Sequence, residues 1–398
     1  MTASEPSRKI YPPKPHQALK SDHGLTPMEA VKILYSEGKE ELSEEIFASL
    51  SRQVFDEKEP DPSGGLRCFL ARAGLLLLKR RTRTEYRQGP DGQEMTVYRN
   101  KLFERSGHPY AMTLLSPSVA NTAAFVEGGD PMNAPYMMIC PTIRRNACTW
   151  DRLLLDSVQC RDVQLRFIWE TRSACEAARA RLDAGKNVRI KAVASGTGLS
   201  AVLVFDRLIR EGYDPDSIAV IMTDREESNV KKARLLLSKL TTTRENPADD
   251  AERKGITART MDLLHEIPSQ EIQGGHRLYH VVTLIGILEY FRGSTCDTTE
   301  EHYGETLFAE ESEGRELIRK ISEMMDDSGL LIANTYRVGA AARIIEVFGK
   351  KLRFRNREDL HALAATGGFV PIKTAGSGNV YDVEIFEKRV SETSNGGG

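Results

Sequence analysis

The stretch Val188–Leu208, VRIKAVASGTGLSAVLVFDRL, decides the fold. An apolar run leads into SGTG, and a second apolar run with helical spacing follows directly. This order predicts a strand, a tight glycine turn and a helix. Gly196 and Gly198 carry no side chain, so a ligand can approach the backbone, and the helix N-terminus offers unpaired N–H groups and a partial positive charge.

The same rhythm continues along the chain from about residue 150. Apolar, strand-like runs occur at 189–194, 218–223, 256–261, 280–285, 330–334 and 381–386, and helical runs separate most of them. The alternation predicts an α/β fold, a Rossmann-like and mostly parallel sheet with helices on both faces. Ligands of such sheets bind beyond the carboxyl ends of the strands, so the residues after each strand are the candidates for a site.

Polar and small residues stand at these positions. Asp224 follows the second strand, 26 residues beyond Gly198, where a carboxylate accepts hydrogen bonds from ribose hydroxyls. The other strand ends bring Asp262, Gly286, Glu289, Tyr290, Asn334 and Tyr336.

Glycine turns of this kind bind either dinucleotides or S-adenosylmethionine. Gly196, Gly198 and Ala201 match the pattern GxGxxA, but this pattern alone does not tell which of the two ligands binds. The whole series of strand ends resembles class I S-adenosylmethionine-dependent methyltransferases, over about residues 150–390. The resemblance implies that the glycine turn holds the methionine part of the cofactor, that Asp224 binds the ribose and that Asp262 binds the adenine. The cofactor-binding residues that it implies are Ser195, Gly196, Thr197, Gly198, Asp224, Arg225, Asp262, Leu263 and Gly286, with Leu288 beside the methyl-transfer face.

The sequence departs from the family pattern at two positions. The acid that opens the usual glycine motif falls at Ala192, and the first of its three glycines falls at Ala194. Another group is therefore expected to contact the carboxylate and amine of the cofactor. Arg161, Arg166 or a group of the N-terminal region are the candidates.

The activity implied by the resemblance is methyl transfer to a small molecule by in-line displacement at an N, S, O or C atom. The candidate catalytic residues are Glu289, Tyr290 and Tyr336, and His280 is a further candidate base for a hydroxyl or a protonated amine. Tyr290, Tyr336 and Arg337 are the candidate substrate-binding residues. An acceptor carboxylate pairing with Arg337 or Arg343 would favour an amino-acid-like or organic-acid substrate.

Three alternatives stay open. A nicotinamide-dependent oxidoreductase would use the same GxGxxA and Asp224, although the turn lies far from the N-terminus and no YxxxK relay follows a later strand. A non-catalytic module would bind the cofactor as a sensor. The third alternative is an enzyme of the same fold that transfers the aminocarboxypropyl group of the cofactor instead of its methyl group.

The residues before 150 do not follow the α/β rhythm. We expect a mainly helical N-terminal region over 1–149, with helices at 27–36, 40–55 and 65–79 and a hairpin of 83–88 and 94–100 around GPDGQ. This region and the loop 116–142 are expected to cover the substrate cleft. The catalytic domain then spans 150–390, and the tail 391–398 is expected to be disordered.

Composition excludes several classes. A formal net charge of −2 argues against nucleic acid as a partner, and the apolar run around 75–78 is too short to span a membrane. The six cysteines form no CxxC pair and the histidines no HxxxH pair, which predicts a cytoplasmic protein without a metal site. A homodimer is left open. Arg353, Arg355 and Arg357 are expected on a solvated face.

Overall fold

The computed structural model describes residues 40–60, 73, 82–88, 94–100, 158–196, 198–225, 227–240, 255–261, 279–291, 311–337 and 353–389. Several expectations fall outside them: the helix at 27–36, most of that at 65–79, the loop 116–142 and the tail 391–398. So do Thr197, Asp262, Leu263 and Arg343, and of Tyr290 only the backbone is described.

One mixed sheet of seven strands forms the centre of the fold, in the order β5-β4-β3-β6-β7-β9-β8. The neighbours from β5 to β7 pair in parallel, whereas β9 runs antiparallel to both β7 and β8. Chain order reverses at β3, which lies between β4 and β6, so the switch point of the sheet is at the end of β3. The strands are β3 (Val188–Val193), β4 (Ile218–Asp224), β5 (Ile256–Thr260), β6 (Tyr279–Leu284), β7 (Met325–Asn334), β8 (Phe369–Ser377) and β9 (Asp382–Lys388).

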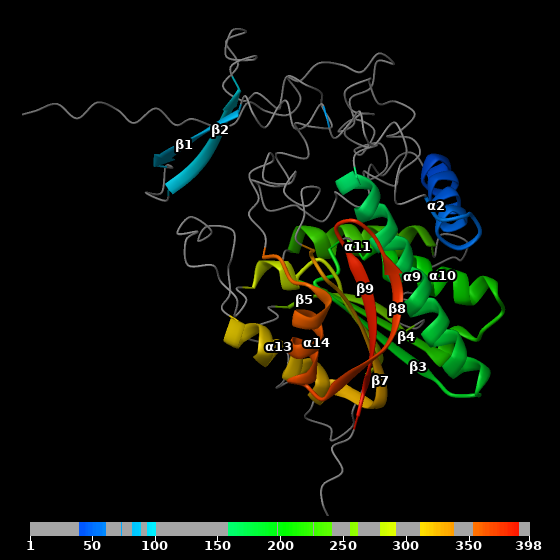
Figure 1. Ribbon diagram of the computed structural model, residues 1–398. Coiled ribbons are helices and arrows are strands. Elements are labelled where there is room, and N and C mark those ends of the chain that lie inside the picture. Colours follow the sequence, from blue (N-terminus) through cyan, green and yellow to red (C-terminus); the bar gives the residue numbers. More distant parts are fainter. Residues whose placement is uncertain are drawn as a thin grey trace, which may run out of the picture.

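Helices cover both faces of this sheet (Figure 1). On one face lie α9 (Val158–Asp183), α10 (Leu199–Arg210) and α11 (Glu227–Leu240), and on the other lie α13 (Glu311–Met324) and α14 (Arg357–Ala365). Two 3₁₀ turns, η3 (Pro215–Ser217) and η4 (Leu288–Tyr290), stand between these elements. The predicted Rossmann-like α/β fold class is confirmed.

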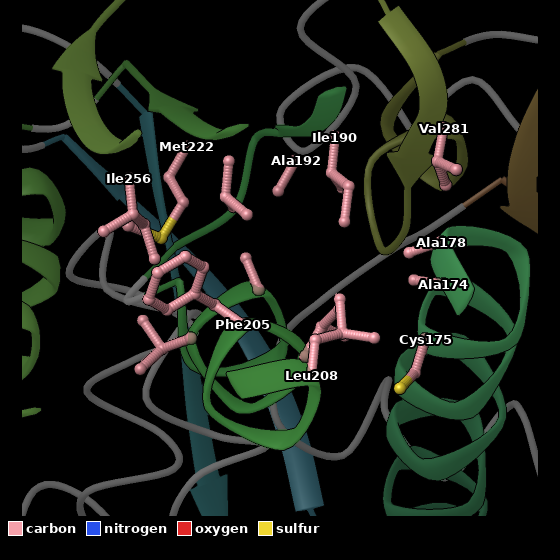
Figure 2. Close-up of a cluster of buried hydrophobic side chains, with 14 of the residues drawn as sticks. Ala174, Cys175, Ala178, Ile190, Ala192, Phe205, Leu208, Met222, Ile256 and Val281 are labelled. Atoms are coloured by element: carbon pink, nitrogen blue, oxygen red, sulfur yellow. The ribbon is translucent and has the colours of Figure 1, made fainter. Parts of the chain in front are cut away.

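Two hydrophobic clusters, one on each face, hold the layers together. Figure 2 shows the first, in which Ile190 and Ala192 of β3 point toward the same helices as Met222 of β4, with Phe205 of α10 packed beneath. Val193 belongs to the second cluster, against α13 and α14. Both faces of β3 are covered, and four of its six side chains are apolar; Lys191, between two of them, is also fully buried.

The structure differs from expectation at the far edge of the sheet. β8 was not predicted, and its side chains between Pro371 and Thr374 are exposed. Proline is tolerated at an edge because its missing N–H interrupts no ladder there. β7 also begins earlier than expected, since it includes the polar residues 326–328 before its apolar run.

The described part of the N-terminal region includes α2 (Glu40–Phe55) and the hairpin of β1 (Thr82–Gln88) and β2 (Glu94–Asn100), as predicted. α2 packs beside α9: Arg172 donates to the backbone oxygens of Val54 and Glu57 at 2.5 and 2.8 Å. Trp169 Nε1 donates to Glu59 at 3.0 Å. These contacts attach the end of α2 to the outer side of α9. That the N-terminal region covers the substrate cleft stays a prediction.

Gly198 brings the glycine turn against the side chain of Met222 in β4. Its φ is 69°, and a Cβ there would lie 2.2 Å from the sulfur of Met222, a side chain that is only 1% exposed. The glycine therefore allows α10 to begin directly against β4.

We predict that Gly198→Ala loses about 1 to 3 kcal/mol more unfolding free energy than Gly185→Ala. Gly185 has the same φ of 69°, but a Cβ added there would meet no atom within 4 Å, so it measures the backbone cost alone. Denaturant titration of both variants checks this. Equal losses would mean that the packing against Met222 does not matter.

Candidate functional site

The glycine turn keeps a left-handed backbone at three residues. Ala194, Gly196 and Gly198 have φ values of 50°, 59° and 69°. An alanine in this region costs about 1–2 kcal/mol relative to glycine. The turn therefore has the shape expected of a glycine-rich motif even where the sequence replaces the first glycine with Ala194.

Asp224 joins this turn to the neighbouring strand. Its Oδ2 accepts a hydrogen bond from the Gly196 N–H at 2.8 Å, and its Oδ1 accepts one from Asn229 Nδ2 at 3.1 Å. The carboxylate is 5% exposed and ends β4. Two residues predicted to bind one ligand thus lie in contact, while Arg225 beside them is exposed.

Three buried polar atoms near this edge have no hydrogen-bond partner within the described residues: Ser195 Oγ, Asn229 Oδ1 and Glu289 Oε2. An unmet buried donor or acceptor costs about 1–3 kcal/mol. Ser195 is one of the predicted cofactor-binding residues, and Asn229, which was not predicted, donates to the predicted residue Asp224. A polar ligand with hydroxyl and amine groups fits these residues.

A second group of residues lies after β6. Arg166 of α9 contacts Glu289 Oε1 at 3.2 Å, and its guanidinium lies 4.3 Å from the centre of the Tyr381 ring. A Cβ on Gly286 would approach the same guanidinium at 3.3 Å, so glycine makes room for the arginine. The Gly286 N–H donates to Asn334 Oδ1 at 2.7 Å, which ties the end of β6 to the end of β7.

Glu170 lies one helical turn beyond Arg166. Burial raises the pKa of Glu170 to about 7, although the Arg166 charge and hydrogen bonds from Thr283 and Ser200 lower it in part. Thr283 is the β6 partner of Ala192, and Ser200 is in the first turn of α10. Glu170 is thus a buried carboxyl group between the glycine turn and β6, and the sequence analysis did not single it out.

Tyr336, a predicted catalytic and substrate-binding residue, is 2% exposed. Its ring stacks on Phe354 at 5.2 Å and lies 5.4 Å from the Tyr381 ring. Through Tyr381 this aromatic group adjoins Arg166. Tyr336 therefore lies beside the second group of residues, within packed aromatic surroundings.

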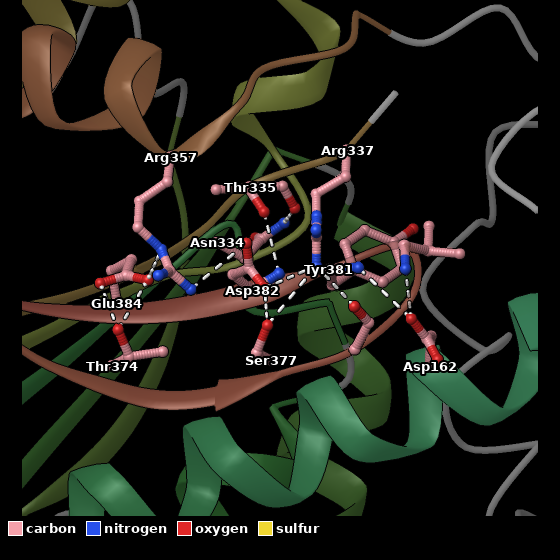
Figure 3. A network of polar contacts seen from close by, with 12 residues as sticks. Asp162, Asn334, Thr335, Arg337, Arg357, Thr374, Ser377, Tyr381, Asp382 and Glu384 are labelled. Carbon is pink, nitrogen blue, oxygen red and sulfur yellow. Dashed lines mark hydrogen bonds and ion pairs between the residues drawn. The ribbon is translucent and has the colours of Figure 1, made fainter. Parts of the chain in front are cut away.

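Arg337, the predicted contact for a substrate carboxylate, belongs to the polar network in Figure 3. It donates to the Gly378 oxygen at 2.7 Å and pairs with Asp382 at 3.3 Å. Asp382 also accepts a hydrogen bond from Ser377 at 2.5 Å, and Arg357 pairs with Glu384 at 2.8 Å. An acceptor carboxylate would have to share Arg337 with Asp382.

The expectation of a solvated face for Arg353, Arg355 and Arg357 is wrong for Arg355, while Arg353 and Arg357 are half-buried. Arg355 is 4% exposed and donates to the backbone oxygens of Leu288 and Phe291, the latter at 3.0 Å. The Arg353 N–H donates to the Glu289 oxygen at 2.7 Å. The segment before α14 therefore braces the turn that carries Glu289.

His280, a further candidate base, lies near the amino end of β6, away from the glycine turn. Its Nδ1 accepts the Arg189 N–H at 2.9 Å, and burial lowers the pKa of the ring to about 4. It takes no part in the groups described above, so His280 is a structural residue.

Within the described residues, no three His, Cys, Asp or Glu side chains gather in a way that could hold a metal ion. Within the described residues, Cys160 and Cys175 are both buried and form no disulfide bond. No helix among the described residues is long and apolar enough to cross a membrane.

No protein-family model matches the chain, and no curated protein matches it. Solved structures do match. Magnesium protoporphyrin IX methyltransferase from Synechocystis PCC 6803, with bound SAH (S-adenosylhomocysteine), is 12% identical and has a TM-score of 0.37 over 57% of this chain and 87% of its own. The same enzyme also matches in a structure with bound SAM (S-adenosylmethionine).

Some of the matches extend over most of the chain. The pyocyanin biosynthetic protein PhzM is 16% identical with a TM-score of 0.40, over 91% of this chain and 98% of its own. A Bordetella parapertussis protein named as a possible exported protein is 12% identical with a TM-score of 0.47, over 89% and 99%. These TM-scores are all below 0.5, so the residues of this chain, rather than the matches, bear on function.

The raised pKa of Glu170 predicts a pH-dependent stability. Between 4.5, its ordinary pKa, and about 7, the folded protein holds a proton that the unfolded chain releases, so stability falls as the pH rises through this window. Glu170→Gln is neutral throughout and avoids this loss. Its unfolding free energy relative to the native chain should rise by about 2 to 3 kcal/mol from pH 5 to pH 8.

Denaturant titrations at the two pH values measure this difference. Glu176→Gln, on an exposed position of the same helix, is the matched control and should show no such change. A pH-independent difference for Glu170→Gln would contradict the raised pKa.

Proposed function

We propose that this protein is an S-adenosylmethionine-dependent methyltransferase acting on a small-molecule acceptor in the cytoplasm. The observation that carries the proposal is the hydrogen bond from the Gly196 N–H to the buried Asp224 carboxylate at the switch point of the sheet. It joins the turn that would receive the methionine part of the cofactor to the acid that would receive its ribose hydroxyls.

The residues present fit this cofactor. Asp224 supplies a carboxylate for the ribose, and the partnerless Ser195 Oγ and Asn229 Oδ1 lie beside it. When bound, the cofactor supplies a methyl group already activated on a sulfonium. The protein has then only to hold the acceptor in line and exclude water, so no catalytic triad is required.

The strand order of the sheet also bears on the main alternative, a nicotinamide-dependent oxidoreductase. Dinucleotide-binding sheets of the Rossmann type run 3-2-1-4-5-6. Here the order from β5 to β7 follows the first five places, but the antiparallel β9 stands between β7 and β8. This departure from the dinucleotide-binding order argues against a nicotinamide-dependent oxidoreductase.

For the acceptor, Tyr290, Tyr336 and Arg337 stay the proposed contacts. Tyr336 adjoins Tyr381 and through it Arg166, at the end of the sheet where the methyl group would be presented. Arg337 is half-buried and anchored by Asp382, so its role would be to orient a carboxylate rather than to provide an unengaged charge. An amino-acid-like or organic-acid acceptor is the class that these residues favour.

Calorimetric titration with S-adenosylhomocysteine, and separately with NADH, tests the proposal. We expect micromolar binding of S-adenosylhomocysteine and none of NADH. Asp224→Ala should weaken that binding by about tenfold to a hundredfold, because it removes charge-assisted hydrogen bonds worth about 1.5–3 kcal/mol.

Asp216→Ala, in the exposed turn before β4, is the matched control and should bind as the native chain does. Binding of NADH alone would replace the proposal with an oxidoreductase. S-adenosylhomocysteine binding without any turnover across a broad acceptor screen would favour the non-catalytic module. Release of methylthioadenosine in place of S-adenosylhomocysteine would indicate aminocarboxypropyl transfer.

A further inference from the structure

Glu289 has a buried oxygen with no partner in the described part of the chain. The residue is 4% exposed, and its Oε1 is held by Arg166 at 3.2 Å while Oε2 makes no hydrogen bond. A buried carboxylate oxygen is a strong acceptor, and leaving it unmet is costly. An N–H donor from a ligand would complete it.

The carboxylate is held in place from several sides. The Arg353 N–H donates to the backbone oxygen of Glu289, and Arg355 donates to the backbone oxygens on either side of it, those of Leu288 and Phe291. Arg166 is itself packed between Gly286 and the Tyr381 ring. A side chain fixed in this way is preorganised, so it loses little entropy on binding.

Glu289 also lies near the surface proposed for the cofactor. Arg166 contacts Glu289 and lies one helical turn from Glu170, which hydrogen-bonds Ser200 in the first turn of α10. That helix begins at Gly198, the last residue of the glycine turn. A series of neighbouring residues therefore connects the glycine turn to Glu289, and all of them lie near the switch point of the sheet.

We propose that Glu289 Oε2 binds the ammonium group at the amino-acid end of the cofactor, with Arg166 as the residue that positions the carboxylate. This inference rests on the proposed function. It assigns to the end of β6 the contact that Ala192 in β3 has no side chain to make. Glu289 is then a binding residue for the cofactor rather than the general base for the acceptor.

Glu170 is the competing carboxyl group, and two observations favour Glu289. Glu170 already accepts hydrogen bonds from Thr283 and Ser200, whereas Glu289 Oε2 accepts none among the described residues. The proton that Glu170 keeps near neutral pH also leaves it a weaker partner for a cation.

Calorimetry with three ligands separates the ammonium from the rest of the molecule: S-adenosylhomocysteine, its deaminated analogue, and 5′-methylthioadenosine, which lacks the amino-acid end. The native chain should bind S-adenosylhomocysteine at least about tenfold more tightly than the deaminated analogue, as a charge-assisted hydrogen bond allows. Glu289→Gln should weaken S-adenosylhomocysteine by a similar factor. It should leave the other two ligands within about twofold, because neither reaches Oε2 with a cation.

The controls are Glu316→Gln, on an exposed position of α13, and Glu170→Gln. Neither should change the preference for the ammonium-bearing ligand. Glu289→Ala is the second variant, and circular dichroism with the thermal midpoint checks that each variant folds. If both Glu289 variants unfold, the native chain alone still tests the inference. Equal affinity of the native chain for S-adenosylhomocysteine and its deaminated analogue would overturn it.

The outcomes are distinct. Equal weakening of all three ligands by Glu289→Gln would mean that Glu289 only supports the turn, and would overturn the inference while leaving the proposed function intact. Loss of the preference in Glu170→Gln instead of Glu289→Gln would assign the ammonium to Glu170 and overturn it also. A native chain that binds none of the three ligands would overturn the proposed function itself.

Discussion

The hydrogen bond between the Gly196 N–H and the Asp224 carboxylate is the contact on which the rest of the site depends. It requires the left-handed backbone of the turn, because only that conformation aims the N–H at the end of β4. It requires Gly198, which lets α10 begin against Met222. Asn229 on α11 then holds the second carboxylate oxygen, so that a strand, a turn and a helix meet at one side chain.

Helix α9 organises the opposite half of the edge. Asp162, Arg166 and Glu170 follow one another at intervals of four residues, so they lie along one face of the helix. Asp162 accepts hydrogen bonds from the backbone N–H groups of Val380 and Tyr381, and Arg166 and Glu170 reach the end of β6. Another part of the same helix carries Trp169 and Arg172, which bind the end of α2.

The sequence predicted those parts of the fold that rest on local pattern. Strands such as β3 and β6 are mostly apolar, and the glycine turn has its own local signature, so the sequence predicts both. β8 was missed because an exposed edge strand has no such pattern. Arg355 and Glu170 were misread or missed for a different reason: both are charged residues buried by partners that lie far away in the sequence, and nothing local announces that burial.

The structure also supports the location of the site independently of any motif. A left-handed alanine, a carboxyl group whose pKa burial raises to about 7, and three buried polar atoms without a partner among the described residues lie around the ends of β3, β4 and β6. Other buried polar atoms of the described residues also lack a hydrogen-bond partner, among them Asp162 Oδ1, Thr257 Oγ1 and His361 Nε2; the last of these has an ion-pair partner, Glu384, at 3.6 Å. Each departure lowers stability, and proteins keep such departures together where a ligand or a reaction uses them. The atoms at the ends of β3, β4 and β6 are the ones that a charged, hydroxyl-bearing cofactor would complete.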